Sequence, residues 1–229
     1  MTRIAILKTG APPPELAPAH GDYPTMFGTL LGEAFETTVF DVQRGEWPDA
    51  YGFDGVIITG SAAGVYEDDP WIGDLLEWIR AAHGRTRLVG VCFGHQAMAK
   101  ALGGRVEKSE RGWGVGLHRY QVTDGAEWMQ PAAATVAIPV SHQDQVVAVP
   151  NHARVTLRSD FTPYAGLAWG DAAISFQGHP EFTPGFASDL TAGRRGRIDG
   201  ALVDRALESL REPDDRALVS DWIRAFFQP

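Results

Sequence analysis

The residue whose type and position most directly suggest chemistry is Cys92, at the centre of Gly90-Val91-Cys92-Phe93-Gly94. It follows the apolar run 87–91, which predicts a buried strand. The pattern G-x-C-x-G is the cysteine form of the nucleophile elbow, a sharp strand-to-helix turn in which glycines allow strand and helix to approach closely. The N-terminus of the following helix would favour the thiolate. We therefore predict that Cys92 is a nucleophile.

A nucleophilic thiol needs a base, because a lone cysteine is also a common buried core residue. His179-Pro180-Glu181 follows the run 173–177, which predicts a strand that ends at the same sheet edge. Imidazole can take the proton of a thiol and later protonate a departing amine. A carboxylate on the other ring nitrogen fixes the tautomer. We predict His179 as general base and acid and Glu181 as its orienting partner; the alternative is a turn histidine beside a surface charge.

Strands that alternate with helices are expected to position these residues. Segments 3–7, 37–40, 55–58 and 87–91 read as strands, and segments 23–35 and 71–82 have helical spacing. This alternation predicts an α/β fold, with an open, mostly parallel sheet covered by helices on both faces and ligands at the carboxyl ends of its strands. The Pro-rich stretch 11–24 predicts a surface loop.

The second half of the chain has a different pattern of apolar residues. Short β-rich runs between 104 and 177 predict a smaller antiparallel portion. Beyond residue 184 the apolar spacing becomes helical again. We expect one domain over 1–229, in which about 190–229 form a C-terminal helical extension.

Composition excludes several classes of function. The 229 residues carry a net charge of −9, which argues against general binding of nucleic acid. The short basic cluster Arg194, Arg195 and Arg197 has no interleaved aromatics and is expected to be a solvated helix face. With one cysteine, no long apolar run and no signal-peptide pattern, the expected location is the cytoplasm, with no membrane role.

Cofactor and metal signals are weak. No His/Cys/Asp/Glu set has metal-ligand spacing, and no G-x-x-x-x-G-K-[ST] phosphate loop occurs in the sequence. The glycines between 112 and 116 lack the strand and helix context of a dinucleotide loop. We expect neither a metal nor a cofactor.

Taken together, the motifs at 90–96 and 178–181 resemble those of the triad-type, class I glutamine amidotransferases, over the chain from its first strand to about residue 190. The chain resembles a stand-alone member of this family that is similar to the amidotransferase domain of GMP synthase. The resemblance implies that Cys92 attacks the side-chain amide of glutamine and that ammonia leaves from a γ-glutamyl thioester. It also implies that His179 and Glu181 complete a triad.

The resemblance extends to further positions. Thr59-Gly60-Ser61 resembles the family's oxyanion strand, which implies that the N–H groups of Gly60 and Phe93 hold the developing oxyanion. Gln96 resembles the family glutamine that contacts substrate. Segment 141–146 resembles the part that recognises the α-amino and α-carboxylate groups, which implies binding roles for a group of three residues: Ser141, Gln143 and Asp144.

Three functions remain open at this stage. The protein is a hydrolase of glutamine or another small γ-glutamyl compound, or the glutaminase subunit of a separate synthetase chain, or a catalytically idle regulatory or binding module. Intact Cys92, His179 and Glu181 disfavour the idle module. The motif residues do not choose between ammonia and an amino acid as the leaving group, because both departures need the same nucleophile, base and oxyanion hole.

Overall fold

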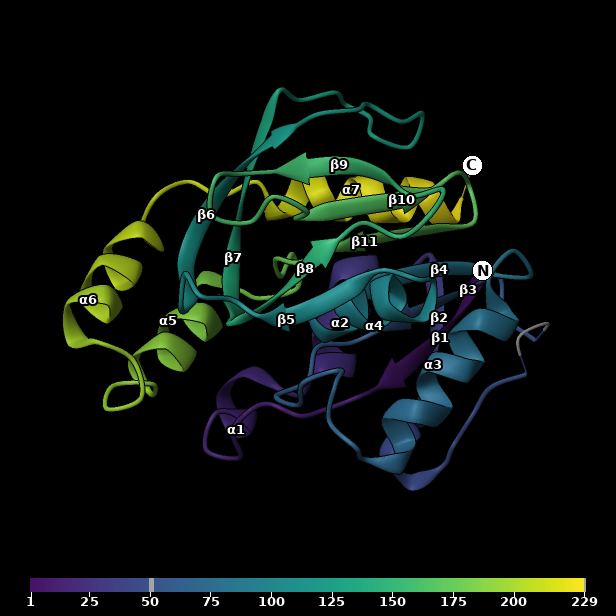
Figure 1. Ribbon diagram of the computed structural model, residues 1–229, viewed down its shortest axis with the longest axis horizontal. Helices are drawn as coiled ribbons and strands as arrows, with labels where there is room; N and C mark the ends of the chain where they lie inside the picture. The colour runs from purple at the N-terminus through teal and green to yellow at the C-terminus, as the bar shows by residue number, and fades with distance from the viewer. Residues whose placement is uncertain (50–51, 229) are drawn as a thin grey trace.

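The computed structural model describes residues 1–49 and 52–228, and its main element is a mixed sheet with helices on both faces (Figure 1). The strand order is β2-β1-β3-β4-β11-β10-β9-β6-β7. The neighbouring pairs from β2 to β11 are parallel, and those from β11 to β7 are antiparallel. The parallel half consists of β1 (Thr2–Lys8), β2 (Phe35–Asp41), β3 (Gly55–Ile58), β4 (Arg87–Val91) and β11 (Ala173–Phe176).

The antiparallel half continues the same sheet, so β11 joins the two patterns. It consists of β10 (Gly166–Trp169), β9 (Arg154–Arg158), β6 (Gly114–Val122) and β7 (Thr135–His142). A separate small antiparallel sheet pairs β5 (Arg105–Lys108) with β8 (Asp144–Ala148). The expected fold class, including its smaller antiparallel portion, is confirmed.

Alternate residues of β1 face two different cores, because successive side chains of a strand point to opposite faces. Ile4 and Ile6 belong to the core that α2 (Tyr23–Leu31) and α7 (Arg216–Phe227) cover. Ala5 and Leu7 belong to the other core, under α3 (Pro70–Ala82) and α4 (Phe93–Ala101). Burial on both faces is typical of strands in a parallel sheet.

The remaining helices lie beside the antiparallel half, at the left of Figure 1. They are α5 (Pro184–Ala192) and α6 (Gly200–Ser209), and both contact β6. Two short helices complete the described elements: α1 (Ala17–His20) and the 3-10 helix η1 (Val42–Arg44).

The Pro-rich stretch 11–24 was expected to be a loop, and this expectation was partly wrong. Helix α1 lies within it, and Pro24 stands in the first turn of α2. Proline is tolerated there because the first N–H groups of a helix have no intrahelical acceptor. The Asp22 side chain caps α2 by accepting a hydrogen bond from the Thr25 N–H at 3.0 Å.

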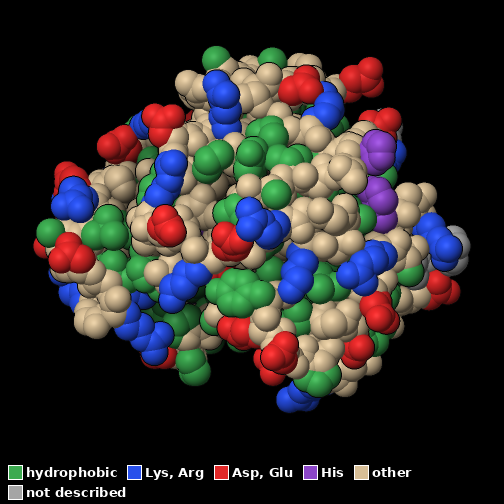
Figure 2. All heavy atoms as spheres, in the orientation of Figure 1, with side chains coloured by type: hydrophobic (Ala, Val, Ile, Leu, Met, Phe, Trp, Pro, Cys, Tyr) green, Lys and Arg blue, Asp and Glu red, His purple; other side chains and the backbone are tan. Residues whose placement is uncertain are grey.

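Acidic and basic side chains are interspersed over the face of the molecule seen in Figure 2. That face therefore does not present a broad field of one sign. Among the helices that the structure describes, none is long and apolar enough to cross a bilayer.

Candidate active site

Cys92 lies between the end of β4 and the first residue of α4, in a strained backbone conformation with φ 52° and ψ −104°. Positive φ is uncommon for a residue with a Cβ and tends to occur at functional sites. The Cys92 N–H donates to the Phe176 carbonyl at 2.8 Å, and the Cys92 carbonyl accepts from the Gln96 N–H at 3.0 Å. These bonds hold the thiol at the carboxyl edge of the sheet, beside the N-terminus of α4.

The two glycines around Cys92 allow α4 to lie close against the sheet. A Cβ on Gly94 would lie 2.2 Å from the carbonyl oxygen of Ile58, and a Cβ on Gly90 would lie 2.6 Å from that of Gly94. Real Cβ atoms do not approach so closely, and both carbonyl oxygens belong to the backbone, which has little room to move. The elbow therefore requires glycine at both positions.

His179 and Glu181 form a buried pair just beyond the end of β11. His179 Nδ1 lies 2.7 Å from Glu181 Oε1, and the two residues are 3% and 4% exposed. The backbone N–H of His179 donates to the Pro139 carbonyl at 2.8 Å, and the His179 ring stacks on Phe182 with centroids 3.8 Å apart. These contacts leave the imidazole little freedom to rotate.

His179 and Cys92 lie close to each other beside Gly60, so the structure brings together the three residues expected to form the triad. Burial lowers the pKa of His179, but the charges of Glu181 and Cys92 outweigh burial and raise that pKa to about 10. The raised pKa favours the imidazolium form of His179. An imidazolium at this position holds a proton of the kind that a leaving amine needs.

Gly60 lies against both members of the Cys92–His179 pair. A Cβ at this position would lie 3.2 Å from His179 Cε1 and 3.8 Å from Cys92 Cβ. Phe93 is the first residue of α4, so its N–H has no intrahelical acceptor. The two residues expected to supply the oxyanion donors thus both lie next to Cys92.

Thr9, which the sequence analysis did not single out, fixes the backbone around Gly60. Its Oγ1 lies 3.0 Å from the Thr59 carbonyl oxygen and 3.1 Å from that of Gly60, and its N–H donates to Thr59 Oγ1 at 3.0 Å. Thr9 and Thr59 are fully buried. The sequence feature that could have identified Thr9 is its position directly after the first strand.

Asp144 contacts Gln96 and also Tyr66, which lies in the loop that follows β3. Gln96 Nε2 donates to the Asp144 carbonyl at 2.9 Å, and the Tyr66 hydroxyl donates to Asp144 Oδ1 at 3.1 Å. Burial raises the pKa of the Asp144 carboxyl, although the bond from Tyr66 counteracts this shift. Burial and the Asp144 charge raise the pKa of Tyr66 to about 12, so Tyr66 remains a donor at neutral pH.

Ser141 and Gln143, on either side of His142, are half-buried near the same segment. Ser141 Oγ is shielded from solvent and has no hydrogen-bond partner among the described residues. The Gln143 carbonyl accepts from the Ser109 N–H at 3.0 Å, which ties this loop to the end of β5. Burial lowers the pKa of His142 to about 3, so its ring is neutral at ordinary pH.

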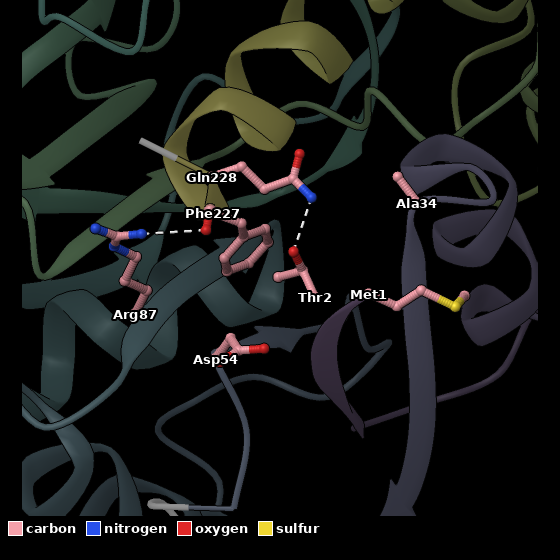
Figure 3. A pocket seen from close by; sticks show the side chains of 7 residues that line it. All are labelled: Met1, Thr2, Ala34, Asp54, Arg87, Phe227 and Gln228. Carbon is pink, nitrogen blue, oxygen red and sulfur yellow. Dashed lines mark hydrogen bonds between the residues drawn. The ribbon is translucent and has the colours of Figure 1, made fainter.

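An open hollow of about 710 Å³ lies away from these residues (Figure 3). Its lining includes Thr2, at the start of β1, and Arg87, at the start of β4. Cys92 follows the end of β4, so the hollow lies at the opposite edge of the sheet. In Figure 3, Arg87 donates a hydrogen bond to the Phe227 carbonyl, and Gln228 donates one to the Thr2 hydroxyl. The bond between Gln228 and Thr2 joins the two ends of the described chain. We assign the chemistry to the Cys92 edge, because the described residues that line the hollow include no nucleophile paired with a base.

Residues 1–49 and 52–228 contain no cluster of three or more His, Cys, Asp or Glu side chains arranged to hold a metal ion. His95, next to the elbow, is buried and its Nδ1 lies 2.8 Å from Ser175 Oγ. It thus packs inside the fold and does not face a ligand.

Comparison with known sequences identifies the family of this chain. The sequence model of the family described as Glutamine amidotransferase class-I matches residues 31–190, and the chain belongs to this family. A glutamine amidotransferase-like protein of Schizosaccharomyces pombe is 30% identical over 95% of both chains. Gamma-glutamyl peptidase 5 of Arabidopsis thaliana is 32% identical over 72% of this chain and 69% of its own length.

Two further comparisons concern domain composition and fold. The GMP synthase of Albidiferax ferrireducens is 30% identical over 72% of this chain but only 34% of its own length. The crystal structure of a glutamine amidotransferase from Thermotoga maritima superposes with a TM-score of 0.81 over 100% of this chain and 99% of that one, at 16% identity. That likeness supports the fold alone.

Proposed function

We propose that this protein is a cysteine hydrolase that cleaves the γ-amide bond of glutamine or of a related small γ-glutamyl compound. The observation that carries the proposal is the strained Cys92 beside the buried His179–Glu181 pair, whose nitrogen and oxygen are 2.7 Å apart. Gamma-glutamyl peptidase names among the relatives support a γ-glutamyl substrate. Glutamine amidotransferase names support the amide.

In the proposed reaction, the Cys92 thiolate attacks the γ-carbonyl carbon, and the N–H groups of Gly60 and Phe93 stabilise the resulting oxyanion. The carbon–nitrogen bond then breaks as the His179 imidazolium transfers its proton to the departing nitrogen. Water, deprotonated by His179, hydrolyses the thioester and releases glutamate. Glu181 keeps the Nδ1 proton of His179 in place throughout.

Asp144 is proposed to bind the ammonium of the γ-glutamyl group. Its carboxylate already accepts one hydrogen bond from Tyr66 and has capacity for more. Gln96 holds the Asp144 backbone in position, and Ser141 and Gln143 are proposed to contact the α-carboxylate from the same loop. No cofactor or metal takes part in this scheme.

The glutaminase subunit of a separate synthetase is the second candidate. It is supported by the GMP synthase relative, of which this chain covers only 34%. In that case ammonia release would be slow until a synthetase chain binds. A purified chain that releases ammonia from glutamine at several turnovers per second would argue against this second candidate.

The experiment offers glutamine, a γ-glutamyl dipeptide and a glutathione conjugate to the wild type and to Cys92→Ala, with ammonia and free glutamate measured separately. Glutamate release from at least one compound, lost in Cys92→Ala, supports the proposal. Thermal unfolding of both proteins shows whether the variant is folded. Glutamate release that survives in folded Cys92→Ala contradicts the proposal.

A further inference from the structure

Arg194 differs from the two arginines beside it. Arg195 is exposed and forms an ion pair with Asp204, and Arg197 is exposed. Arg194 is only partly exposed, and its guanidinium carbon lies 4.5 Å from the centroid of the Trp113 ring. The expectation of a solvated face was therefore wrong for Arg194, because the turn after α5 directs this side chain onto Trp113.

One nitrogen of Arg194 is an unsatisfied donor. Nη1 is shielded from solvent and has no hydrogen-bond partner in the described part of the chain. Leaving a buried charged donor unpaired is costly, and guanidinium has no acceptor capacity with which to satisfy itself. Burial lowers the pKa of Arg194, but arginine stays charged. Such a donor is suited to an anion that arrives with a ligand.

Arg194 lies on the His179 side of the nucleophile. Phe182 stacks on His179, and Tyr23 stacks on Phe182 with centroids 5.9 Å apart. Tyr23 also contacts Phe186 of α5, the helix that Arg194 follows. Cys92 and Tyr23 both lie close enough to Arg194 to interact with it electrostatically. This places the guanidinium within electrostatic range of the reacting sulfur.

Asp144 belongs to a different group of residues. It bonds to Tyr66 in the loop after β3, whereas His179 and Phe182 follow β11, and β3 and β11 flank β4 on opposite sides. In the proposed reaction the γ-glutamyl ammonium binds Asp144, and the departing nitrogen takes its proton from His179. The leaving group must therefore lie on the side of the site where Arg194 is found.

We propose that Arg194, backed by Trp113, binds a carboxylate on the leaving amine, so that the preferred substrates are γ-glutamyl amino acids or peptides rather than glutamine. This inference rests on the proposed function. The γ-carbon–nitrogen bond breaks as the Cys92 thioester forms, and the leaving amino acid departs with the proton from His179. Arg194 does not take part in the bond changes and acts through binding of the leaving group.

The test compares two substrates of nearly equal size, γ-glutamylglycine and γ-glutamylglycinamide, which differ in a carboxylate and a neutral amide. Wild type is expected to show a kcat/KM about 10- to 100-fold higher for γ-glutamylglycine, the effect of one charge-assisted bidentate interaction. In Arg194→Gln this preference should disappear, while kcat/KM for the glycinamide stays within about twofold. Arg194→Lys should restore part of the preference, because a point charge replaces the planar fork.

The matched control is Arg197→Gln, which removes an exposed arginine three residues away and should keep the wild-type preference. Equal wild-type rates for both compounds overturn the inference and leave the proposed function standing. An equal loss on both substrates in Arg194→Gln also overturns it, since that result indicates a structural role. Wild type that cleaves neither compound, nor glutamine, overturns the proposed function together with the inference.

Discussion

His179 Nδ1 lies 2.7 Å from Glu181 Oε1, and both side chains are almost fully buried. The two residues are separated only by Pro180, which restricts the backbone between them. In this arrangement the carboxylate accepts the hydrogen of Nδ1 and fixes the orientation of the ring, so Nε2 is available for Cys92.

Removal of the Glu181 charge is expected to weaken catalysis strongly. In Glu181→Gln the tautomer and orientation of His179 are lost, and kcat/KM should fall by about 10³- to 10⁴-fold. The Glu181 charge helps to raise the pKa of His179 to about 10, so the alkaline limb of any remaining activity should move to lower pH. The measurement is a pH–rate profile of both proteins.

Glu212→Gln is a matched control for this change, because Glu212 forms an exposed ion pair with Arg119 away from the site. It should leave the rate and the pH profile as in wild type. A Glu181→Gln variant with wild-type kcat/KM would show that the carboxylate does not orient a catalytic histidine.

Gly94→Ala is expected to disrupt the elbow. The added Cβ would lie 2.2 Å from the carbonyl oxygen of Ile58, which requires α4 to move from the sheet and should cost about 3 kcal/mol or more in the free energy of unfolding. Gly73→Ala in α3 is the control, since nothing lies within 4 Å of its added Cβ. The control should raise the free energy of unfolding by about 0.5–1 kcal/mol. Urea unfolding measures both; similar stabilities for the two variants would contradict the close packing.

Asp144→Asn is expected to affect substrate binding more than the chemical step. Loss of the carboxylate should raise KM for a γ-glutamyl substrate by about 10- to 100-fold, with a smaller change in kcat. Asp124→Asn, which removes an exposed partner of Arg154, is the control. Steady-state kinetics distinguish the effects: a fall in kcat at unchanged KM would place Asp144 outside the binding of the substrate's ammonium.

Stability is expected to fall in acid because of buried neutral histidines. Burial lowers the pKa of His95 and of His142 to about 3, below the unfolded value near 6.5. Below pH 6.5 the unfolded state therefore binds more protons, so stability is fully present above about pH 6.5 and is lost as pH falls toward 3. Urea midpoints at pH 7 and pH 4.5 should show this loss.

The variant His95→Gln should reduce the difference between those two midpoints, because one of the titrating rings is gone. His152→Asn is the control: His152 is exposed with φ 64°, a conformation that asparagine tolerates. It should keep the wild-type difference. Equal midpoints at both pH values in wild type would show that these histidines do not limit stability in acid.

Features carried by local sequence were predictable, and contacts between distant segments were not. The elbow at Cys92 and the His179–Glu181 spacing are each contained in a few residues that follow a strand, so period and turn signals locate them. Tyr66 meets Asp144 across 78 positions, and Arg194 meets Trp113 across a comparable span. Only the folded arrangement of loops brings these partners together.

The helix after the Pro-rich stretch illustrates a boundary that local rules predict poorly. Helical spacing was expected to run over 23–35, but α2 ends at Leu31, where Gly32 adopts a positive φ of 78°. Phe35 instead begins β2, because pairing with β1 overrides its helical spacing. Strand pairing of this kind is not visible in a single sequence.

The central claim is that Cys92 carries a γ-glutamyl thioester during turnover. The most direct test is intact-protein mass spectrometry of enzyme quenched in acid a few milliseconds to seconds after mixing with a γ-glutamyl substrate. The account predicts an adduct with the mass of one γ-glutamyl group, located on Cys92 by peptide mapping and absent from Cys92→Ala. Turnover by the wild type with no adduct at any quench time, together with undiminished turnover by Cys92→Ala, would contradict the account.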